Sequence, residues 1–350
     1  IHELLDRGHL EADDVGAFLE RHEFPLAEGP HVTFVFRGEA NEVRLQHWIF
    51  GLPSSQAFRR VEGTDLWYLI QELPPGSRVE YKLEIVRGDV HELIRDPRNP
   101  NLAHDPFGAN SVCQATGYEE PEWVREDPEA RPGTIEERVI ASAALGGPRR
   151  VGLYLPARYR ETRRYPLLIA HDGRDYLRFA ALKVVLDNMI HRLEIPPVIV
   201  ALTDPGDRLR EYAADGRHAR FVVEELLPAL ERDYPVDGRV RFRALMGASF
   251  GAVAALSTAW TYPDVFGRLL LQSGSFAFTD IGSNRRGPAF EPVVEFVNRF
   301  RDEPGRPAEK MFVSCGMYES LIYENRSLVP LLQSTGMDVR YVEARDGHNW

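Results

Sequence analysis

The chain has 350 residues, of which 43% are hydrophobic and 27% charged, a balance typical of globular proteins with a large buried core. Its formal net charge of -11 disfavours binding to a nucleic-acid backbone or an anionic membrane. The two cysteines, Cys113 and Cys315, fall in different predicted domains, which argues against a disulfide framework and favours a reducing compartment. No membrane-length apolar run and no signal peptide are visible, so we expect a cytoplasmic protein with no membrane or nucleic-acid partner.

The first part of the chain predicts a helical segment followed by an all-β domain. Apolar residues at rough helical spacing predict a helical segment over residues 1–25 that packs against a neighbouring domain. The residues of this stripe are Leu4, Leu5, Val15, Phe18 and Leu19. Short runs rich in β-branched and aromatic residues, separated by turn formers, then predict strands at 32–36, 42–46, 66–70 and 79–85. This pattern predicts a β-sandwich domain over residues 26–118.

Three aromatic residues of this domain allow two interpretations. Trp48, Trp67 and Tyr81 either form a platform on which sugars stack or fill the core of the sandwich or its interface with the next domain, and we favour the second interpretation. Residues 119–133 are rich in proline and lack periodicity, which predicts a linker with Trp123 as its anchor.

From residue 134 to the end, strands alternate with helices. Strands are predicted at 134–141, 150–155, 165–170, 197–202, 240–246, 268–272, 310–314 and 338–343. Helices are predicted at 179–193, 219–231, after residue 250 and at 321–334. Nearly continuous apolar strands are typical of a parallel sheet with helices on both faces. We therefore predict an α/β fold, with a doubly wound, mostly parallel sheet over residues 134–350 behind the smaller sandwich.

One motif in this second domain carries chemistry. Residues 247–251 read Gly-Ala-Ser-Phe-Gly and match G-x-S-x-G, the pattern of a nucleophile elbow. In such an elbow a sharp turn from strand to helix holds the serine in a strained backbone position, and the glycines avoid clashes. The five-residue pattern is a weak signal by itself, but a predicted strand precedes it and a predicted helix follows. We predict that Ser249 is a nucleophile.

A serine hydroxyl needs a general base, and four histidines of the second domain are candidates. His348 follows the last predicted strand, which places it at the carboxyl edge of the sheet, where ligands bind in such folds. His171 lies at the same edge, directly after an early strand. His191 and His218 fall on predicted helices and are expected to be solvated. We predict His348 as the base.

The base in turn needs a group that orients its ring. Glu319 is the first carboxylate after the strand predicted at 310–314, although a carboxylate at a helix start is also common for dipole reasons. Glu324 falls within the following helix, and Asp346 is too close to His348 in sequence to reach the far ring nitrogen. The order Ser249, Glu319, His348 is that of α/β-hydrolases.

A site for acyl transfer to a serine also needs N–H donors for the tetrahedral oxyanion. The first predicted donor is the backbone N–H of Phe250, directly after the nucleophile. The second is the N–H of Arg174, in the loop after the strand at 165–170, where Gly173 lets the backbone turn toward Ser249.

The Arg174 side chain allows two interpretations of equal weight. It contacts an anionic or catecholate part of a substrate, or it pairs with Asp172 or Asp175. The predicted substrate-binding residues are Asp172, Gly173, Arg174 and Trp350.

Several segments together resemble the enterochelin esterase group within the esterase D-like α/β-hydrolases. They are HDG at 171–173, RLREY at 208–212, FVVEELLP at 221–228, GASFG at 247–251, QSGS at 272–275 and GHNW at 347–350. The segments GTDLW at 63–67, PGSRVEY at 75–81 and DPRNP at 96–100 are similar to the immunoglobulin-like sandwich that precedes the hydrolase domain in that group. The resemblance covers nearly the whole chain.

The resemblance implies a serine carboxylic-ester hydrolase whose triad falls on Ser249, Glu319 and His348. The acid of this family is commonly Asp, so Glu319 is a departure. The expected partner is a small-molecule ester, with no cofactor. His2, His9 and His22 lack the spacing of a metal site.

Other functions stay open at this point. The same triad occurs in feruloyl and acetyl-xylan esterases. An acyltransferase would use it too, and a carbohydrate-binding protein could carry an inactive hydrolase domain. The sequence leaves the oligomeric state open, with a homodimer among the alternatives.

Overall fold

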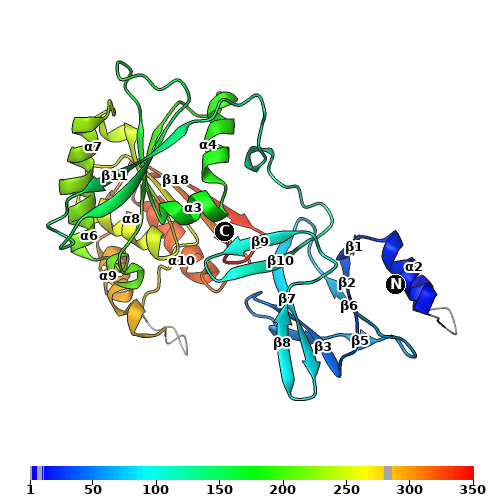
Figure 1. The fold of residues 1–350 in the computed structure, drawn as a ribbon. Coiled ribbons are helices and arrows are strands. Elements are labelled where there is room, and N and C mark those ends of the chain that lie inside the picture. Colours follow the sequence, from blue (N-terminus) through cyan, green and yellow to red (C-terminus); the bar gives the residue numbers. More distant parts are fainter. Residues whose placement is uncertain (1, 6–9, 11, 280–285) are drawn as a thin grey trace. The chain divides into compact units, whose positions relative to one another are not determined.

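A computed structural model describes residues 2–5, 10, 12–279 and 286–350 of the chain (Figure 1). Contacts between residues divide it into two compact units. The first unit comprises Ile1–Glu120, Gly316–Ser320 and Arg345–Trp350, and the second comprises Pro121–Cys315 and Leu321–Ala344. The two short segments that join the first unit from the end of the chain contain Glu319 and His348.

The first unit contains two antiparallel sheets. One has the strand order β1 (Leu26–Glu28), β2 (His31–Arg37), β6 (Leu66–Glu72), β5 (Arg59–Arg60). The other has the order β4 (Ser55–Ala57), β3 (Glu42–His47), β7 (Arg78–Arg87), β10 (Gly108–Gln114), β9 (Leu102–Asp105), and β8 (Val90–Ile94) also pairs with β7. The four strands predicted from β-branched and aromatic runs correspond to β2, β3, β6 and β7.

The two sheets share one core, because alternate residues of each strand point toward the other sheet. The rings of Phe34 on β2 and Tyr81 on β7 meet edge to face, with centroids 4.9 Å apart. Trp67 is also buried in this core, as favoured from the sequence. Trp48 lies outside this core, with an exposed fraction of 58%.

The opposite face of the β2–β6 sheet is covered by helix α2 (Ala12–Arg21). Val15, Phe18 and Leu19 of the predicted stripe pack there against Val35 and Leu66. Helix α1 (His2–Leu5) precedes α2. Residue 1, residues 6–9, which include His9, and residue 11 of the predicted helical segment lie outside the described residues.

The second unit is built on an eight-stranded sheet. Its order is β11 (Thr134–Ile140), β12 (Arg149–Leu155), β14 (Ile199–Thr203), β13 (Leu167–His171), β15 (Arg243–Ala248), β16 (Arg268–Gln272), β17 (Lys310–Gly316), β18 (Asp338–Ala344). The pairs β13–β14, β13–β15, β15–β16 and β16–β17 are parallel. The pairs β11–β12 and β12–β14 are antiparallel. The predicted α/β-hydrolase sheet, mostly parallel, is confirmed.

Helices flank this sheet, with α4 on one side and α6 and α7 on the other (Figure 1). The helices of this unit are α3 (Gly173–Phe179), α4 (Leu182–His191), α5 (Arg208–Glu211), α6 (Gly216–Arg220), α7 (Leu227–Asp233), α8 (Phe250–Thr261), α9 (Glu291–Asp302) and α10 (Ile322–Ser334). A π-helical turn, Phe221–Leu226, joins α6 to α7, and short 3₁₀ turns lie at Glu122–Val124, Val240–Phe242 and Pro288–Phe290.

Two predicted elements have different bounds. The helix predicted at 179–193 corresponds to α4 and begins only at Leu182, because Ala181 takes a left-handed conformation with φ 49°. The preceding helix α3 was not predicted. The strand predicted from residue 240 begins at Arg243, since its partner β13 starts at Leu167. Pro166 precedes that partner and has no N–H to extend the ladder.

None of the helices in the described part of the chain combines the length and hydrophobicity that crossing a bilayer requires.

Candidate active site

Ser249 occupies a sharp turn between β15 and α8. Its backbone angles are φ 57° and ψ -120°, a combination that residues other than glycine rarely adopt. The Ser249 N–H donates to the carbonyl of Gln272 at 3.0 Å, which ties the turn to the end of β16. This is the strained strand-to-helix geometry that a nucleophile elbow requires.

The two glycines of the motif are needed because the turn is so tight. A Cβ atom on Gly247 would lie 2.3 Å from the carbonyl carbon and oxygen of Gly251. A Cβ atom on Gly251 would lie 3.3 Å from the Asp172 carboxylate. The first contact is impossible without backbone movement, and the second is tighter than ordinary van der Waals contact.

The hydroxyl of Ser249 lies 3.0 Å from that of Ser275. The Ser275 N–H also donates to the Ser249 carbonyl at 3.2 Å, and Ser275 is buried. No role for Ser275 is predicted from the sequence. Its position just after the carboxyl end of β16 is the signal that points to it.

Glu319 and His348 form a direct pair within the first unit. The His348 Nδ1 and Glu319 Oε2 atoms are 2.5 Å apart. Glu319 is only 2% exposed, and its Oε1 accepts a hydrogen bond from the Gly316 N–H at 2.6 Å. With Nδ1–H donating to the carboxylate, Nε2 of His348 is left as the proton acceptor of the ring. Trp350, predicted to bind substrate, is partly buried in the same unit.

The two rival carboxylates are engaged elsewhere. Glu324 pairs with Arg286. Asp346 contacts Arg78 at 3.2 Å and accepts a hydrogen bond from the Gly347 N–H. Glu319 is thus the carboxylate, of these three, that contacts the His348 ring.

Asp172, predicted to bind substrate, is buried beneath the elbow. Its carboxylate accepts three hydrogen bonds of 2.7 to 3.1 Å from the Arg208 guanidinium. Arg208 also donates to the carbonyl of Ala248 at 3.2 Å, and the Asp172 N–H donates to the Tyr212 hydroxyl at 3.2 Å. Because Asp172 is 2% exposed, this placement favours support of the Ser249 turn over contact with a substrate. Arg208 had no predicted role.

Arg174 pairs with Asp204, and not with Asp172 or Asp175 as one of its two interpretations predicts. Its Nε atom lies 3.1 Å from Asp204, and its backbone N–H donates to the same carboxylate at 3.1 Å. The Arg174 N–H can donate to an oxyanion only after its hydrogen bond to Asp204 is broken. Gly173 is required because its backbone lies close to Leu202: a Cβ atom on residue 173 would be 2.5 Å from that residue. The residue of this turn with a left-handed backbone is Asp172, with φ 56°.

Two buried histidines lie beneath the Ser249 turn. His171 Nδ1 lies 2.9 Å from the carbonyl of Met246, and the Nε2 atoms of His171 and His218 are 3.1 Å apart. His171 is therefore the Nδ1–H tautomer, and His218 donates from Nε2. Burial lowers the pKa of His171 and lowers that of His218 well below its usual value. The prediction of a solvated His218 was wrong, because α6 turns it toward the sheet, whereas His191 is exposed.

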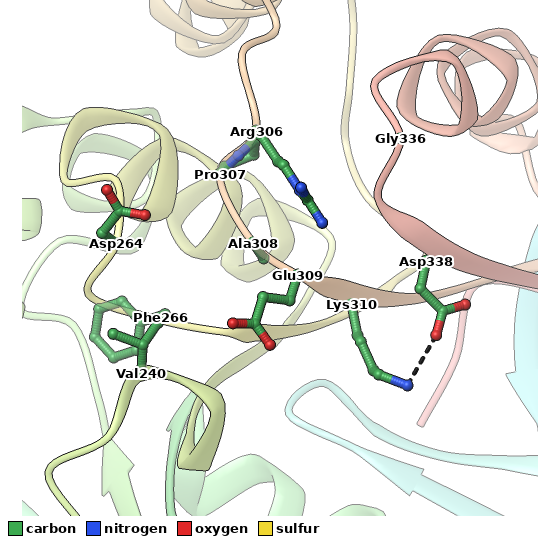
Figure 2. Close-up of a pocket in the computed structure, with 10 residues that line it drawn as sticks. All are labelled: Val240, Asp264, Phe266, Arg306, Pro307, Ala308, Glu309, Lys310, Gly336 and Asp338. Carbon is green, nitrogen blue, oxygen red and sulfur yellow. Dashed lines mark ion pairs between the residues drawn. The ribbon is translucent and has the colours of Figure 1, made fainter.

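A cavity of about 480 Å³ lies at the opposite end of the strands (Figure 2). Lys310 and Asp338, which begin β17 and β18, form an ion pair of 2.9 Å in its wall. Ser249 follows the other, carboxyl end of the sheet, so this cavity is separate from the elbow. Among the described residues there is no group of three or more His, Cys, Asp or Glu side chains that could hold a metal ion.

The sequence model of the putative esterase family matches residues 142–344. Over 320 residues the chain is 23% identical to the iron(III) enterobactin esterase of Escherichia coli O6:H1, covering 84% of this chain and 78% of the relative. It is 32% identical over 148 residues to the uncharacterized protein YjcH of Bacillus subtilis. That match covers 40% of this chain and 62% of YjcH, so the chain spans less than two thirds of that relative.

Solved structures share the fold. The ferric enterobactin esterase of Salmonella typhimurium superposes with a TM-score of 0.76 at 22% identity, covering 93% of this chain and 91% of the other. A ferulic acid esterase superposes with a TM-score of 0.54 at 20% identity, covering 63% and 92%. Since the family match extends over more than half of the chain, the protein belongs to the putative esterase family and is an α/β-hydrolase of the carboxylic-ester hydrolase class.

Proposed function

We propose that the protein cleaves small-molecule carboxylic esters through an acyl-enzyme on Ser249, with His348 as general base and Glu319 as the acid that orients it. The observation that carries the proposal is the strained turn that presents Ser249 between β15 and α8. The Glu319–His348 pair adds support, because it leaves Nε2 of the ring ready to accept a proton. All three residues follow the ends of β15, β17 and β18, strands of one sheet.

In the proposed reaction, the Ser249 oxygen forms a bond to the ester carbonyl carbon while His348 takes the hydroxyl proton. The tetrahedral intermediate then expels the alcohol, which takes the proton from His348. Water attacks the acyl-enzyme in the same manner and releases the acid. Glu319 stays ionised throughout and stabilises the imidazolium.

The oxyanion is proposed to bind at the start of α8. The Phe250 N–H is the first of that helix, where N–H groups have no partner within the helix and the dipole favours negative charge. The Arg174 N–H stays the proposed second donor, and it must first release Asp204.

The relatives suggest a substrate. The iron(III) enterobactin esterases of two Escherichia coli strains align with 84% of this chain, and the solved structure from Salmonella typhimurium covers 93% of it. We therefore propose a siderophore ester of the enterobactin type as substrate. The second candidate is a feruloyl ester, since a ferulic acid esterase shares the fold over 63% of the chain.

A panel of esters tests both. The wild-type protein and Ser249→Ala are assayed with p-nitrophenyl butyrate, methyl ferulate, acetylated xylan and ferric enterobactin, and product release is measured. Removal of the nucleophile is expected to lower kcat by about 10⁴-fold or more. Ser257→Ala is the matched control, because Ser257 is a buried serine of α8 whose hydroxyl donates to the Ala254 carbonyl of the same helix.

The highest kcat/KM on ferric enterobactin supports the first candidate, and the highest value on methyl ferulate supports the second. Equal rates for wild type and Ser249→Ala contradict the serine mechanism. Binding to xylan without any ester turnover indicates a carbohydrate-binding protein with an inactive domain.

A further inference from the structure

The turn that carries His348 is tied to strand β7. The Arg78 N–H, at the start of β7, donates to the carbonyl of Arg345 at 2.9 Å. The Arg78 guanidinium lies 3.2 Å from the Asp346 carboxylate, and the Arg345 guanidinium donates to the carbonyl of Pro75. Residues distant in sequence thus connect the antiparallel sheets of the first unit to Arg345–Trp350, the segment that contains His348.

Asp346 is the centre of this connection. Its Oδ1 atom accepts hydrogen bonds from the Gly347 N–H at 2.8 Å and from the Asn349 side chain at 2.9 Å. Its backbone carbonyl accepts a hydrogen bond of 3.0 Å from the N–H of Tyr318, the residue before Glu319. The side chain of Asp346 therefore shapes the turn around His348, and its backbone joins that turn to the one carrying Glu319.

The two turns are in close backbone contact. A Cβ atom on Gly316 would lie 2.5 Å from the Asp346 carbonyl and 2.8 Å from that of Gly347. The turn carrying Glu319 has its own anchors in the first unit, because the Tyr318 hydroxyl lies 2.5 Å from the Ser77 hydroxyl. A small displacement of Asp346 would therefore move His348 relative to Glu319.

Arg78 is itself held in place. Its second guanidinium nitrogen contacts Glu80 at 3.2 Å, and the other oxygen of Glu80 accepts a hydrogen bond from Asn110 at 2.8 Å. The side chains of Arg78 and Glu80 are only 15% and 8% exposed, so this pairing is poorly screened by solvent. Burial alone would lower the pKa of Arg78, but Asp346 and Glu80 outweigh it and raise that pKa.

We propose that Arg78 is a positioning residue for ester cleavage: through Asp346, it holds the His348 turn in register with the Glu319 turn. The inference rests on the proposed function, in which His348 is the base. It gives the N-terminal β unit a part in catalysis, namely support of the acid–base pair, and this part does not require contact with the substrate.

The test compares Arg78→Met with Arg78→Lys. Methionine keeps the packing of the aliphatic stem and loses the charge, whereas lysine keeps a charge that can still pair with Asp346. With p-nitrophenyl acetate, Arg78→Met is expected to lower kcat by about 10- to 100-fold and leave KM within about twofold, since misplacing a catalytic group affects the chemical step. Arg78→Lys is expected to recover kcat to within about fivefold of wild type.

Asp346→Asn and the double variant complete the cycle. Asparagine keeps the oxygen that shapes the turn and loses the ion pair. If Arg78 acts through Asp346, the double variant is no more than about twofold slower than the slower single variant, because coupled residues are not additive. Arg37→Met, which breaks the Arg37–Asp65 ion pair elsewhere in the first unit, is the matched control for loss of stability. Its kcat is expected to equal that of wild type.

The possible results separate the two proposals. If His348→Ala and Ser249→Ala keep wild-type kcat, the proposed function fails. If those variants are inactive and Arg78→Met has wild-type kcat, or equals Arg78→Lys, the positioning role is overturned. A double variant that multiplies the two single losses also overturns it, because the residues then act independently.

Discussion

Burial separates the role of Ser249 from those of His171 and His218, the two histidines beneath its turn. Ser249 ends the strand in a strained turn at the edge of the sheet. The two histidines lie behind it, fully or nearly fully buried, and bind Met246 and each other. Their lowered pKa values suit them to a neutral, structural role, because protonation would leave a charge in an apolar site.

The histidine pair makes stability depend on pH. Unfolded histidines bind protons below about pH 6.5, whereas the folded state keeps these two neutral, so the unfolded state gains protons as the pH falls. The free energy of unfolding is therefore expected to decrease as the pH falls from 7 to 5, by up to about 1.4 kcal/mol per pH unit for each histidine. His218→Gln keeps an N–H donor and does not titrate, so its slope should be smaller.

Urea unfolding at pH 7, 6 and 5 measures these slopes. His191→Gln is the control, because His191 is exposed and lies outside the pair. A slope for His218→Gln equal to that of wild type would show that His218 does not gain a proton on unfolding.

The acid of the proposed triad is tested by Glu319→Gln. The amide can no longer stabilise the charged imidazole or select its tautomer, so we expect kcat to fall by about 10² to 10⁴-fold. His348→Ala is expected to lose more, because it removes the base itself. Initial rates with p-nitrophenyl butyrate measure both. Glu324→Gln is the control, since Glu324 pairs with Arg286, and an equal loss in that variant would contradict the assignment of Glu319.

The turn between β15 and α8 depends on close contact between the backbone at Gly247 and the backbone at Gly251. Gly247→Ala is expected to destabilise the fold by about 3 kcal/mol, because the new Cβ atom would lie 2.3 Å from the Gly251 backbone. Thermal unfolding by calorimetry measures the loss. Gly147→Ala, where the added atom meets nothing within 4 Å, should unfold near the wild-type temperature. Equal melting temperatures for the two variants would contradict the account of the elbow.

Sequence patterns were sufficient for the elements that depend on local chemistry. Apolar runs and turn formers located the eight strands of the second unit and β2, β3, β6 and β7 of the first, and G-x-S-x-G located the turn at Ser249. The remaining strands of the first unit, β1, β4, β5, β8, β9 and β10, were not predicted. The break at Ala181 and the late start of β15 were missed, because a left-handed alanine has no composition signal and the end of a ladder is set by the partner strand. Trp123 is 42% exposed, and it is Asn188 that holds the linker, through the carbonyls of Trp123 and Arg125.

At the scale of the molecule, the sequence order of the strands was enough to select Glu319 and His348 as partners, and the structure brings them into contact. It could not predict which residues support the site. The ion pair between Asp172 and Arg208 and that between Arg78 and Asp346 join residues far apart in the chain. Ion pairs of this kind depend on tertiary packing, and the spacing of residues along the chain does not predict them.

The proposed catalytic residues belong to different units, although all three come from the second half of the chain. Ser249 belongs to the unit built on the parallel sheet, whereas Glu319 and His348 group with the antiparallel sheets through the contacts of Arg78 and Tyr318. Substitutions near Arg78 are therefore expected to reduce activity while the second unit stays folded.

The central claim is that Ser249 carries the acyl group. The most direct measurement is mass spectrometry of the protein mixed with p-nitrophenyl acetate and quenched in acid within the first turnover. One added acetyl group is expected on the peptide containing Ser249 in the wild-type protein, and none in Ser249→Ala. Hydrolysis without an acetylated Ser249, or an acetyl group on a different residue of an active protein, would contradict it.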